Sequence, residues 1–478
     1  MAPEILALEP AAASEPSALA GLATYRIETW GCQMNEHDSE RMAGVLQSWG
    51  LRPASGERDA DIILLNTCSI REKAAQKVFT RLGQLRIEKQ ARPHLVLGVC
   101  GCVAQQERER ILSRAPYVDV VMGPRRIADL PALIAESRRR GHALGLFDPR
   151  ENLIPAEAMA ARVSRTRAYV TVMEGCNKNC TFCIVPLTRG REACRPPDAI
   201  LREVRRCVME GLSEIELLGQ NVNAWRHAGS ESWDFTRLLG AVARTPGVGR
   251  LRFTTSHPLH FKNSIIDAMA SHDSISRHLH LPVQSGSNAI LKRMRRGYTR
   301  EEYLDRVDRL RRLMPDVALS TDIIVGFPGE SDDDFEATMR LVEEIRFDSI
   351  FSFLYSSRPH TPAAEYPDDV PELEKKARLW RLQEMQADIQ LERNRAWEGR
   401  TVRVLVDALA KREARQVCGR SSQNHVVTLP GGADLIGRFV DVRIERGGAH
   451  GLSGAAENSL TFVGHSDIHD GQLSVEKS

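Results

Sequence analysis

Two regions of this 478-residue chain alternate short apolar runs of β-strand type with amphipathic stretches of helical period. Such alternation predicts parallel strands covered by helices, because consecutive parallel strands need a crossover connection between them. In the first region, strands are expected at residues 25–29, 61–66 and 95–99. We therefore predict an α/β domain with a parallel sheet over residues 24–141.

The second region, residues 162–396, carries six further strand patterns, and a helical pattern from Glu372 to Trp397 ends it. Six strand-helix units predict a partial, TIM-like β/α barrel. Active sites of such folds collect where loops leave the C-terminal ends of the strands. The expected strands are residues 169–173, 214–218, 250–254, 278–282, 317–325 and 349–353.

Short β-type runs at residues 401–407, 425–429 and 439–446, separated by Gly-rich turns, predict a small OB-like β-barrel over residues 397–466. We expect tails at residues 1–23 and 467–478 and a linker at 142–161, where Pro and Ala occur without periodicity. The first tail lacks the basic start and apolar block of a secretory signal, and no apolar run approaches a membrane span. A cytoplasmic protein without membrane attachment is expected.

Ten cysteines in a reducing compartment favour metal ligation or catalysis over disulfides. Cys176, Cys180 and Cys183 stand in EGCNKNCTFC, directly after the first expected barrel strand. Three thiolates leave one iron of a 4Fe-4S cluster open, whereas a structural zinc ion normally has four protein ligands. A zinc loop completed by Cys194, or a group of buried thiols, is the alternative.

A second set of cysteines follows the three expected strands of the first region: Cys32 in TWGCQMN, Cys68 in LLNTCSIREKA, and Cys102 in GVCGCVAQ. Loops at the carboxyl ends of parallel strands meet at one edge of a sheet, so these thiols should converge and are able to surround one cluster. Three unrelated buried cysteines are the alternative, and Cys100 competes with Cys102.

The CxxxCxxC spacing after the first barrel strand, with Phe182 before the last Cys, resembles the radical S-adenosylmethionine superfamily. The resemblance implies that the open iron binds the methionyl amino and carboxylate groups of S-adenosylmethionine. It also implies that one electron from the cluster cleaves this cofactor to give a carbon radical, so that the cofactor supplies the difficult chemistry.

Three further loops resemble cofactor-facing loops of that superfamily: LGQNVNAWR, PVQSGS and DIIVGFPGE. Helix caps and ordinary strand-to-helix turns are the alternative for each. His257 and His280 either line the cavity or are hydrogen-bonded structural residues, and Cys194, Cys207 and Cys418 are interpreted as packing residues. The predicted cofactor-binding residues are Gln220, Asn221, Ser285, Ser287, Asp322 and Gly326.

The order of the three parts resembles the methylthiotransferase family from about Thr24 onward, and the last part resembles a TRAM module. This resemblance implies a second, auxiliary 4Fe-4S cluster on Cys32, Cys68 and Cys102, with Cys102 rather than Cys100 as the third ligand. It further implies two molecules of S-adenosylmethionine per turnover, one as methyl donor and one as radical source.

Among members of that family, the motifs NTCSIREKA and GQNVNAW most resemble those of enzymes that act on N6-isopentenyl(dimethylallyl)adenosine in tRNA. The implied reaction adds a methylthio group to C2 of this base at position 37, in the anticodon loop. The alternatives are methylthiolation of threonylcarbamoyladenosine-37 in tRNA or of a ribosomal-protein aspartate, and, in another class, a noncatalytic iron-sulfur RNA-binding sensor.

The implied partners are tRNA, a reductant such as flavodoxin or ferredoxin, and a sulfur donor, and a monomer is expected. A target base must leave its stack to reach a barrel opening, and cations on a small β-barrel are able to hold the phosphates. A solvated charged face is the alternative. The predicted RNA-binding residues are Arg400, Arg403, Lys411, Arg412, Arg415 and Arg420.

Overall fold

The computed structural model describes residues 4–5, 19–69, 72–147, 160–229, 231–411 and 415–457. The chain divides into two compact units, Met1–Gln390 and Leu391–Ser478. The predicted tail at 467–478 and most of the predicted linker lie outside the described residues, whereas Leu19, within the predicted first tail, is buried in the core. Within the described ranges, no helix is both long and apolar enough to cross a membrane.

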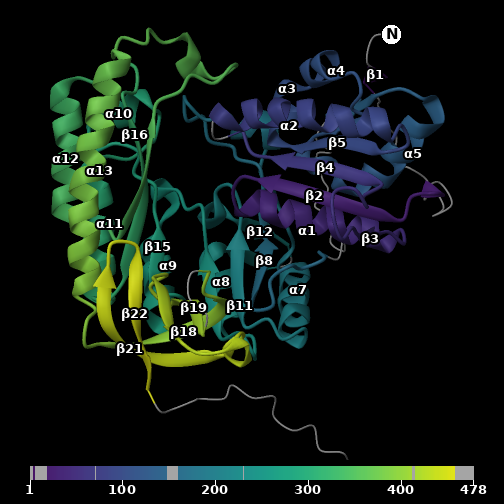
Figure 1. Cartoon of the computed structure of the whole chain (residues 1–478). Helices are drawn as coiled ribbons and strands as arrows, with labels where there is room; N and C mark the ends of the chain where they lie inside the picture. The colour runs from purple at the N-terminus through teal and green to yellow at the C-terminus, as the bar shows by residue number, and fades with distance from the viewer. Residues whose placement is uncertain are drawn as a thin grey trace, which may run out of the picture. The chain divides into compact units, whose positions relative to one another are not determined.

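The first unit begins with a seven-stranded parallel sheet of order β1-β7-β6-β5-β4-β2-β3 (Figure 1), which confirms the predicted α/β layer. Its strands are β1 (Glu4–Ile5), β2 (Thr24–Trp30), β3 (Arg52–Pro53), β4 (Ile62–Thr67), β5 (Val96–Gly101), β6 (Val120–Met122) and β7 (Leu144–Leu146). Its helices are α1 (Gln33–Ser48), α2 (Glu72–Ala91), α3 (Cys102–Glu107), α4 (Glu109–Arg114) and α5 (Leu130–Arg140), with a 3-10 helix at Pro124–Asp129.

Alternate residues of β4 explain why helices cover both faces of this sheet. Ile63 and Leu65 pack in one apolar cluster with residues of α2 and α4, whereas Ile62 and Leu64 pack in another with residues of α1 and α5. Every residue of β4 and β5 is buried, as expected for strands inside a parallel sheet covered on both sides. The polar loops are therefore left at the ends of the strands.

The remainder of the first unit contains two three-stranded parallel sheets, β14-β11-β8 and β15-β16-β17. A parallel bridge between Leu251 and Ile275 links the end of the first sheet to the segment that leads into the second. The six strands confirm the predicted partial barrel in chain order. They are β8 (Arg167–Thr171), β11 (Glu214–Leu218), β14 (Arg250–Phe253), β15 (His278–His280), β16 (Ala318–Val325) and β17 (Ser349–Leu354).

Helices cover the outer face of these strands, and Figure 1 shows several of them beside β15 and β16. Val170, Ile215 and Leu319 point into the apolar cluster beneath the helices. The opposite, concave face is polar, with Glu214 paired to Arg250 at 3.2 Å. The main helices are α6 (Val185–Arg189), α7 (Pro197–Met209), α8 (Phe235–Ala243), α9 (Asn263–Ser271), α10 (Asn288–Arg293), α11 (Arg300–Leu313), α12 (Asp332–Ile345) and α13 (Glu372–Arg395).

The second unit is a closed barrel of order β18-β19-β20-β22-β21. It confirms the predicted small barrel, but two strands were missed, β19 and β22, because glycines interrupt their β-strand patterns. A Cβ at Gly419 would lie 2.7 Å from the carbonyl carbon of Leu405, so glycine is required by the close approach of the strands. The strands are β18 (Thr401–Leu409), β19 (Gln416–Ser421), β20 (Val426–Pro430), β21 (Phe439–Gly448) and β22 (Gly451–Ala456).

Candidate iron-sulfur and cofactor site

Strand register brings the three cysteines of the first sheet to one edge. Trp30 pairs with Thr67, and Thr67 pairs with Gly101, so β2, β4 and β5 end level with one another. Cys32 precedes α1, Cys68 directly follows β4, and Cys102 is the first residue of α3. These three cysteines, called the first triad below, therefore lie where the topology predicts.

The thiols of the first triad interact with one another and with an arginine from the barrel region. A hydrogen bond with Cys68, helped by the charge of Arg189 and opposed by burial, lowers the pKa of Cys32 to about 6. Burial raises the pKa of Cys102, although the Arg189 guanidinium acts in the opposite direction. Thiolates bind iron, so a cation beside these sulfur atoms favours the ligand form.

Cys100 lies apart from this set. It is 1% exposed on β5 and packs with Leu46 and Leu64 in the apolar cluster between the sheet and α1. Burial raises the pKa of Cys100 to about 12, which keeps it a neutral thiol. The geometry therefore supports Cys102, not Cys100, as the third member of the triad.

The second triad, Cys176, Cys180 and Cys183, lies on the loop between two short antiparallel strands, β9 (Met173–Glu174) and β10 (Ala193–Cys194). Gly175 has φ +80°, and a Cβ there would lie 2.5 Å from the Gly190 carbonyl oxygen, so only glycine fits where the loop starts. The Cys176 amide donates to that same oxygen at 3.1 Å. Cys194 lies on β10, where it pairs with Met173 of β9, so it is outside the loop.

Two buried side chains converge on Cys180. The Arg296 Nη1 atom donates to its Sγ atom at 3.4 Å, and the His257 Nε2 atom lies 4.0 Å from the same sulfur. Burial and the neighbouring Cys180 raise the pKa of Cys183 to about 12. Donors aimed at a sulfur atom suit an anionic ligand better than a neutral thiol.

The donor sets of the two triads fit an iron-sulfur cluster. In the part of the chain that the structure describes, no three His, Cys, Asp or Glu side chains converge closely enough to hold one metal ion. A four-iron cluster is larger than one ion and is held by thiolates arranged around it. Two triads of thiols with cationic or neutral donors beside them therefore fit this kind of cofactor.

Gln220 and Asn221, two of the predicted cofactor-binding residues, lie beside the second triad. The Gln220 Oε1 atom accepts from the Gly175 amide at the start of the cysteine loop, and Asn221 Nδ2 donates to Glu192 at 3.4 Å. Gln220 Nε2 and Asn221 Oδ1 are buried and have no hydrogen-bond partner among the described residues. Unsatisfied buried amide atoms beside the triad are consistent with a polar ligand.

The other four predicted cofactor residues are partly used in structural contacts. Ser287 caps α10 through Ile290 and donates to Asp334, while Ser285 lies 3.4 Å from the Thr338 hydroxyl. Their direct contact with a cofactor stays a prediction.

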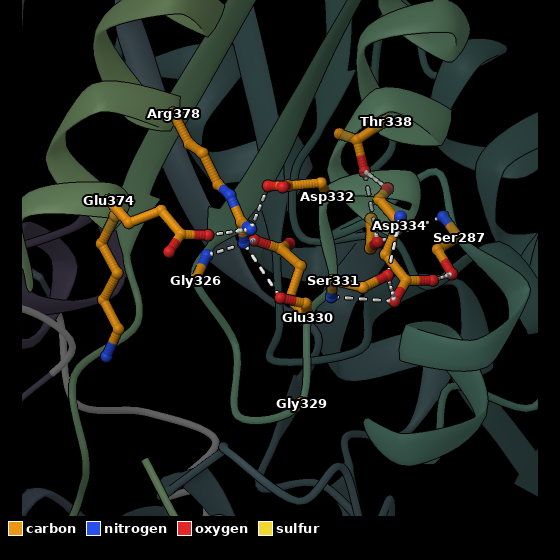
Figure 2. Close-up of polar contacts among 12 residues, drawn as sticks. Ser287, Gly326, Gly329, Glu330, Ser331, Asp332, Asp334, Thr338, Glu374 and Arg378 are labelled. Carbon is orange, nitrogen blue, oxygen red and sulfur yellow. Dashed lines mark hydrogen bonds and ion pairs between the residues drawn. The ribbon is translucent and has the colours of Figure 1, made fainter. Parts of the chain in front are cut away.

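Asp322 faces the barrel interior on β16, 3.6 Å from His280 Nε2, and Gly326 has φ +71° and donates to Glu330 at 2.7 Å (Figure 2). Figure 2 shows that Arg378 joins Glu330 to neighbouring carboxylates. The loop after β16 is thus fixed by an ionic network centred on the buried pair Glu330 and Arg378. Contact of Asp322 or Gly326 with a cofactor also stays a prediction.

The predicted RNA-binding residues are spread over the second unit. Arg400 stacks on the Trp397 ring at 5.4 Å, Arg403 lies 4.9 Å over the Phe439 ring, and Arg420 donates to Asn424. Lys411 and Arg415 are exposed, and Arg412 lies outside the described residues. Trp397 is partly buried against the apolar core of the barrel and Phe439 is buried, so these two rings hold the exposed guanidinium groups at the surface.

Sequence reasoning missed Arg189 and Arg296, which contact the two triads. Arg189 follows the cysteine loop on α6, and this proximity in sequence to Cys183 was the available signal. Arg296 is distant from Cys180 in sequence, and only the folded barrel brings the two together.

Family comparisons cover each part of the chain. Residues 24–123 match the uncharacterized protein family UPF0004, residues 170–342 match the radical SAM superfamily, and residues 395–455 match the TRAM domain. Structures of the radical S-adenosylmethionine methyltransferase TsrM from Kitasatospora setae align with TM-scores of 0.51 and 0.52 at 13% identity. They cover 71% and 72% of this chain and 74% and 77% of the other chains, a likeness that shows the fold alone.

Curated relatives match over nearly their whole length. The tRNA-2-methylthio-N(6)-dimethylallyladenosine synthase of Thiobacillus denitrificans is 49% identical, over 90% of this chain and 97% of its own. The proteins of the same name from Aromatoleum aromaticum and Carboxydothermus hydrogenoformans are 48% and 45% identical, over 97% and 98% of their lengths. The chain therefore belongs to the family of tRNA-2-methylthio-N(6)-dimethylallyladenosine synthases, within the radical SAM superfamily.

Proposed function

We propose that this chain is a transferase that adds a methylthio group to C2 of N6-dimethylallyladenosine at position 37 of tRNA. The observation that carries this proposal is the 49% identity to a relative of that name over 97% of its length. The two cysteine triads within one compact unit support it, because the reaction needs both a sulfur atom and a means of activating an aromatic C–H bond.

We propose that Cys32, Cys68 and Cys102 hold one 4Fe-4S cluster and that Cys176, Cys180 and Cys183 hold another. The second triad offers three thiolates on one loop, which leaves one iron of a cluster free to bind S-adenosylmethionine. When bound, these cofactors supply a methyl group, a sulfur atom and the radical that removes hydrogen from C2. Two molecules of S-adenosylmethionine are used per turnover in this proposal, one for each role.

The chain's own residues orient these groups. Gln220 fixes the start of the second cysteine loop through the Gly175 amide, and Arg296 holds Cys180 from the barrel side. The concave face of the barrel, with Asp322 and His280 on adjacent strands, offers hydrogen-bonding groups to a base that has left its stack. Arg400 on its Trp397 platform is suited to contact the tRNA backbone.

We further propose that the protein works as a monomer in the cytoplasm, with tRNA as its substrate. A low-potential reductant such as flavodoxin or ferredoxin would supply electrons, and a separate donor would replace the sulfur that is transferred. These partners follow from the chemistry of the reaction.

Mass spectrometry of tRNA nucleosides from cells with and without the gene tests the proposal. Loss of 2-methylthio-N6-dimethylallyladenosine, with accumulation of N6-dimethylallyladenosine, is expected. The wild-type gene should restore the product, whereas Cys183→Ala and Cys68→Ala should not.

The alternatives predict other results. A change confined to threonylcarbamoyladenosine would assign the chain to that tRNA substrate, and an unchanged tRNA profile with an unmodified ribosomal-protein aspartate would assign it to the protein substrate. A noncatalytic sensor would form no 5'-deoxyadenosine from S-adenosylmethionine under strong reductant, even with both clusters reconstituted.

A further inference from the structure

Arg189 links the two cysteine triads. It ends α6, the short helix that follows the loop of the second triad, and α6 packs against α3, which begins at Cys102 of the first triad. The guanidinium is 2% exposed, and its Nη2 atom donates to Asp38 Oδ2 at 2.5 Å. A side chain supplied by the second loop therefore lies at the site of the first triad.

One nitrogen of this guanidinium lacks a hydrogen-bond partner among the described residues. Its partner Asp38 lies on α1, whose N-cap is Cys32, and α6 packs against α3, whose first residue is Cys102, so the guanidinium lies between two helices that begin at the first triad. The Nη1 atom is buried and has no hydrogen-bond partner among the described residues. A buried charged donor without an acceptor is unfavourable, so an acceptor from outside the polypeptide is indicated.

Other buried arginines nearby have different partners. Arg41 pairs with Glu174 at 2.8 Å and with Asp38 at 3.6 Å, and Arg125 lies 3.7 Å from Glu174. Arg41 shares the carboxylate of Asp38 with Arg189, but it directs its Nη1 atom to Glu174 and Asp38. Arg41 is therefore a matched control for the effect of the ionic network alone.

We propose that Arg189 is a positioning residue whose Nη1–H donates a hydrogen bond to a sulfur atom of the cluster held by Cys32, Cys68 and Cys102. This inference rests on the proposed function, because it assumes that the first triad holds a cluster. The loop that carries one triad thereby also holds the sulfur atoms of the other cluster in a fixed orientation. Hydrogen bonds and positive charge near cluster sulfurs raise the reduction potential, because the reduced cluster carries more negative charge.

The test uses the full chain with Cys176, Cys180 and Cys183 all changed to Ala, reconstituted with iron and sulfide, so that only the first triad holds a cluster. Iron content and the midpoint potential, followed by electron paramagnetic resonance, are compared among the parent, R189K, R189Q and R41Q. Lysine at 189 keeps the charge and the partnership with Asp38 but has no second nitrogen to reach the cluster.

A lower midpoint potential is expected in R189K and a still lower one in R189Q, while R41Q titrates with the parent. A parent-like potential in R189K would overturn the inference, because pairing with Asp38 would then suffice. An equal shift in R41Q would also overturn it, because the network rather than the donor would be responsible. If R189Q binds no iron, the midpoint potential of R189K compared with the parent still tests the inference.

These readouts do not involve tRNA, so they separate the inference from the proposed function. Suppose that the midpoint potential shifts only in the Arg189 variants and that the tRNA profile in cells is unchanged. The inference would then hold, and the proposed tRNA substrate would be wrong. If the parent binds no iron, the first triad does not hold a cluster and the inference is wrong. The tRNA nucleosides would still test the reaction independently.

Discussion

The Nε2 atom of His257 lies 4.0 Å from the Sγ atom of Cys180. Burial, followed by the charge of Arg296, lowers the pKa of His257 to about 2, so the imidazole is neutral. Its Nδ1 atom accepts from the Leu259 amide at 3.2 Å, so the proton of the neutral ring is on Nε2 and faces the sulfur. His257 is thus both a structural histidine and a neighbour of the second triad.

His257→Phe should reduce the stability of the apoprotein. The ring volume is kept, but the Leu259 amide loses its acceptor and Cys180 loses a neighbouring donor, which should cost about 1–3 kcal/mol. Urea unfolding of both proteins without iron measures the difference. An unchanged unfolding midpoint would show that neither contact stabilises the fold.

Cys102→Ala and Cys100→Ala should differ sharply in iron binding. Cys102 begins α3 at the edge where the first triad meets, whereas Cys100 is buried in the apolar cluster with Leu46. Cys102→Ala should therefore lose about half of the iron of a two-cluster enzyme, and Cys100→Ala should keep all of it with about 1 kcal/mol less stability. Iron and sulfide analysis after reconstitution checks both, and the reverse pattern would make Cys100 the ligand.

Gly101→Ala should disrupt the first triad, because Gly101 combines φ +87° with close packing. A Cβ there would overlap the Asn66 Oδ1 atom and lie 2.9 Å from the Thr67 carbonyl oxygen, directly before Cys102. We expect loss of iron and a destabilisation of at least about 2 kcal/mol.

Gly83→Ala is the matched control for that substitution. Gly83 lies within α2, and a Cβ there meets nothing within 4 Å. Removing a glycine from a helix interior should raise the stability by about 0.5–1 kcal/mol. Thermal unfolding of both variants tests the pair, and equal effects would contradict the steric argument.

Arg400→Ala should weaken tRNA binding through the loss of a phosphate contact. Arg400 is exposed and held on the Trp397 ring, whereas Arg403 pairs in strand register with Asp441, which offsets its charge. The slope of log affinity against log salt should fall by about 1 for Arg400→Ala and by less for Arg403→Ala. Fluorescence anisotropy with labelled tRNA at several salt concentrations measures these slopes.

The control for that experiment is Arg381→Ala, on α13, where the arginine is exposed and paired with Glu336 at 2.7 Å. It removes the same charge from the other unit and should leave the slope unchanged. A slope that falls equally in Arg381→Ala would indicate a general effect of net charge, and an unchanged slope in Arg400→Ala would remove this residue from the interface.

The strands of both sheets could be predicted because buried parallel strands are continuous apolar runs, and β4 and β16 lie where the pattern places them. The convergence of Cys32, Cys68 and Cys102 followed from the same reasoning, since parallel strands that end in register bring their following loops together. Strands β19 and β22 were missed because Gly419 and Gly454 weaken the pattern that barrel closure requires.

Side chains that complete the site could not be predicted in this way. Arg189 and Asp38 are 151 residues apart in the sequence, and their ion pair depends on how α6 packs against α3. No local pattern distinguishes such an arginine from one that faces solvent. Periodicity locates strands and helices, whereas partners between distant elements depend on tertiary packing.

Glu330 should make the stability depend on pH. Its Oε2 atom accepts from the Gly326 amide at 2.7 Å and from Arg378 at 3.0 Å, yet burial outweighs both contacts and raises its pKa to about 7. Because the pKa in the folded protein exceeds the ordinary value of 4.5, the folded state binds more protons between these pH values. The free energy of unfolding therefore falls as the pH rises from below 4.5 through about 7.

Replacing Glu330 by Gln removes this titration, so the pH dependence of wild type minus Glu330→Gln isolates the carboxyl group. Relative to the variant, the wild type should lose roughly 3 kcal/mol between pH 4.5 and pH 8, because a tenfold change in proton affinity corresponds to about 1.4 kcal/mol. Urea unfolding at both pH values measures the difference. Parallel profiles would mean that the pKa of Glu330 is the same in the folded and unfolded states, so that the contacts with Gly326 and Arg378 offset its burial.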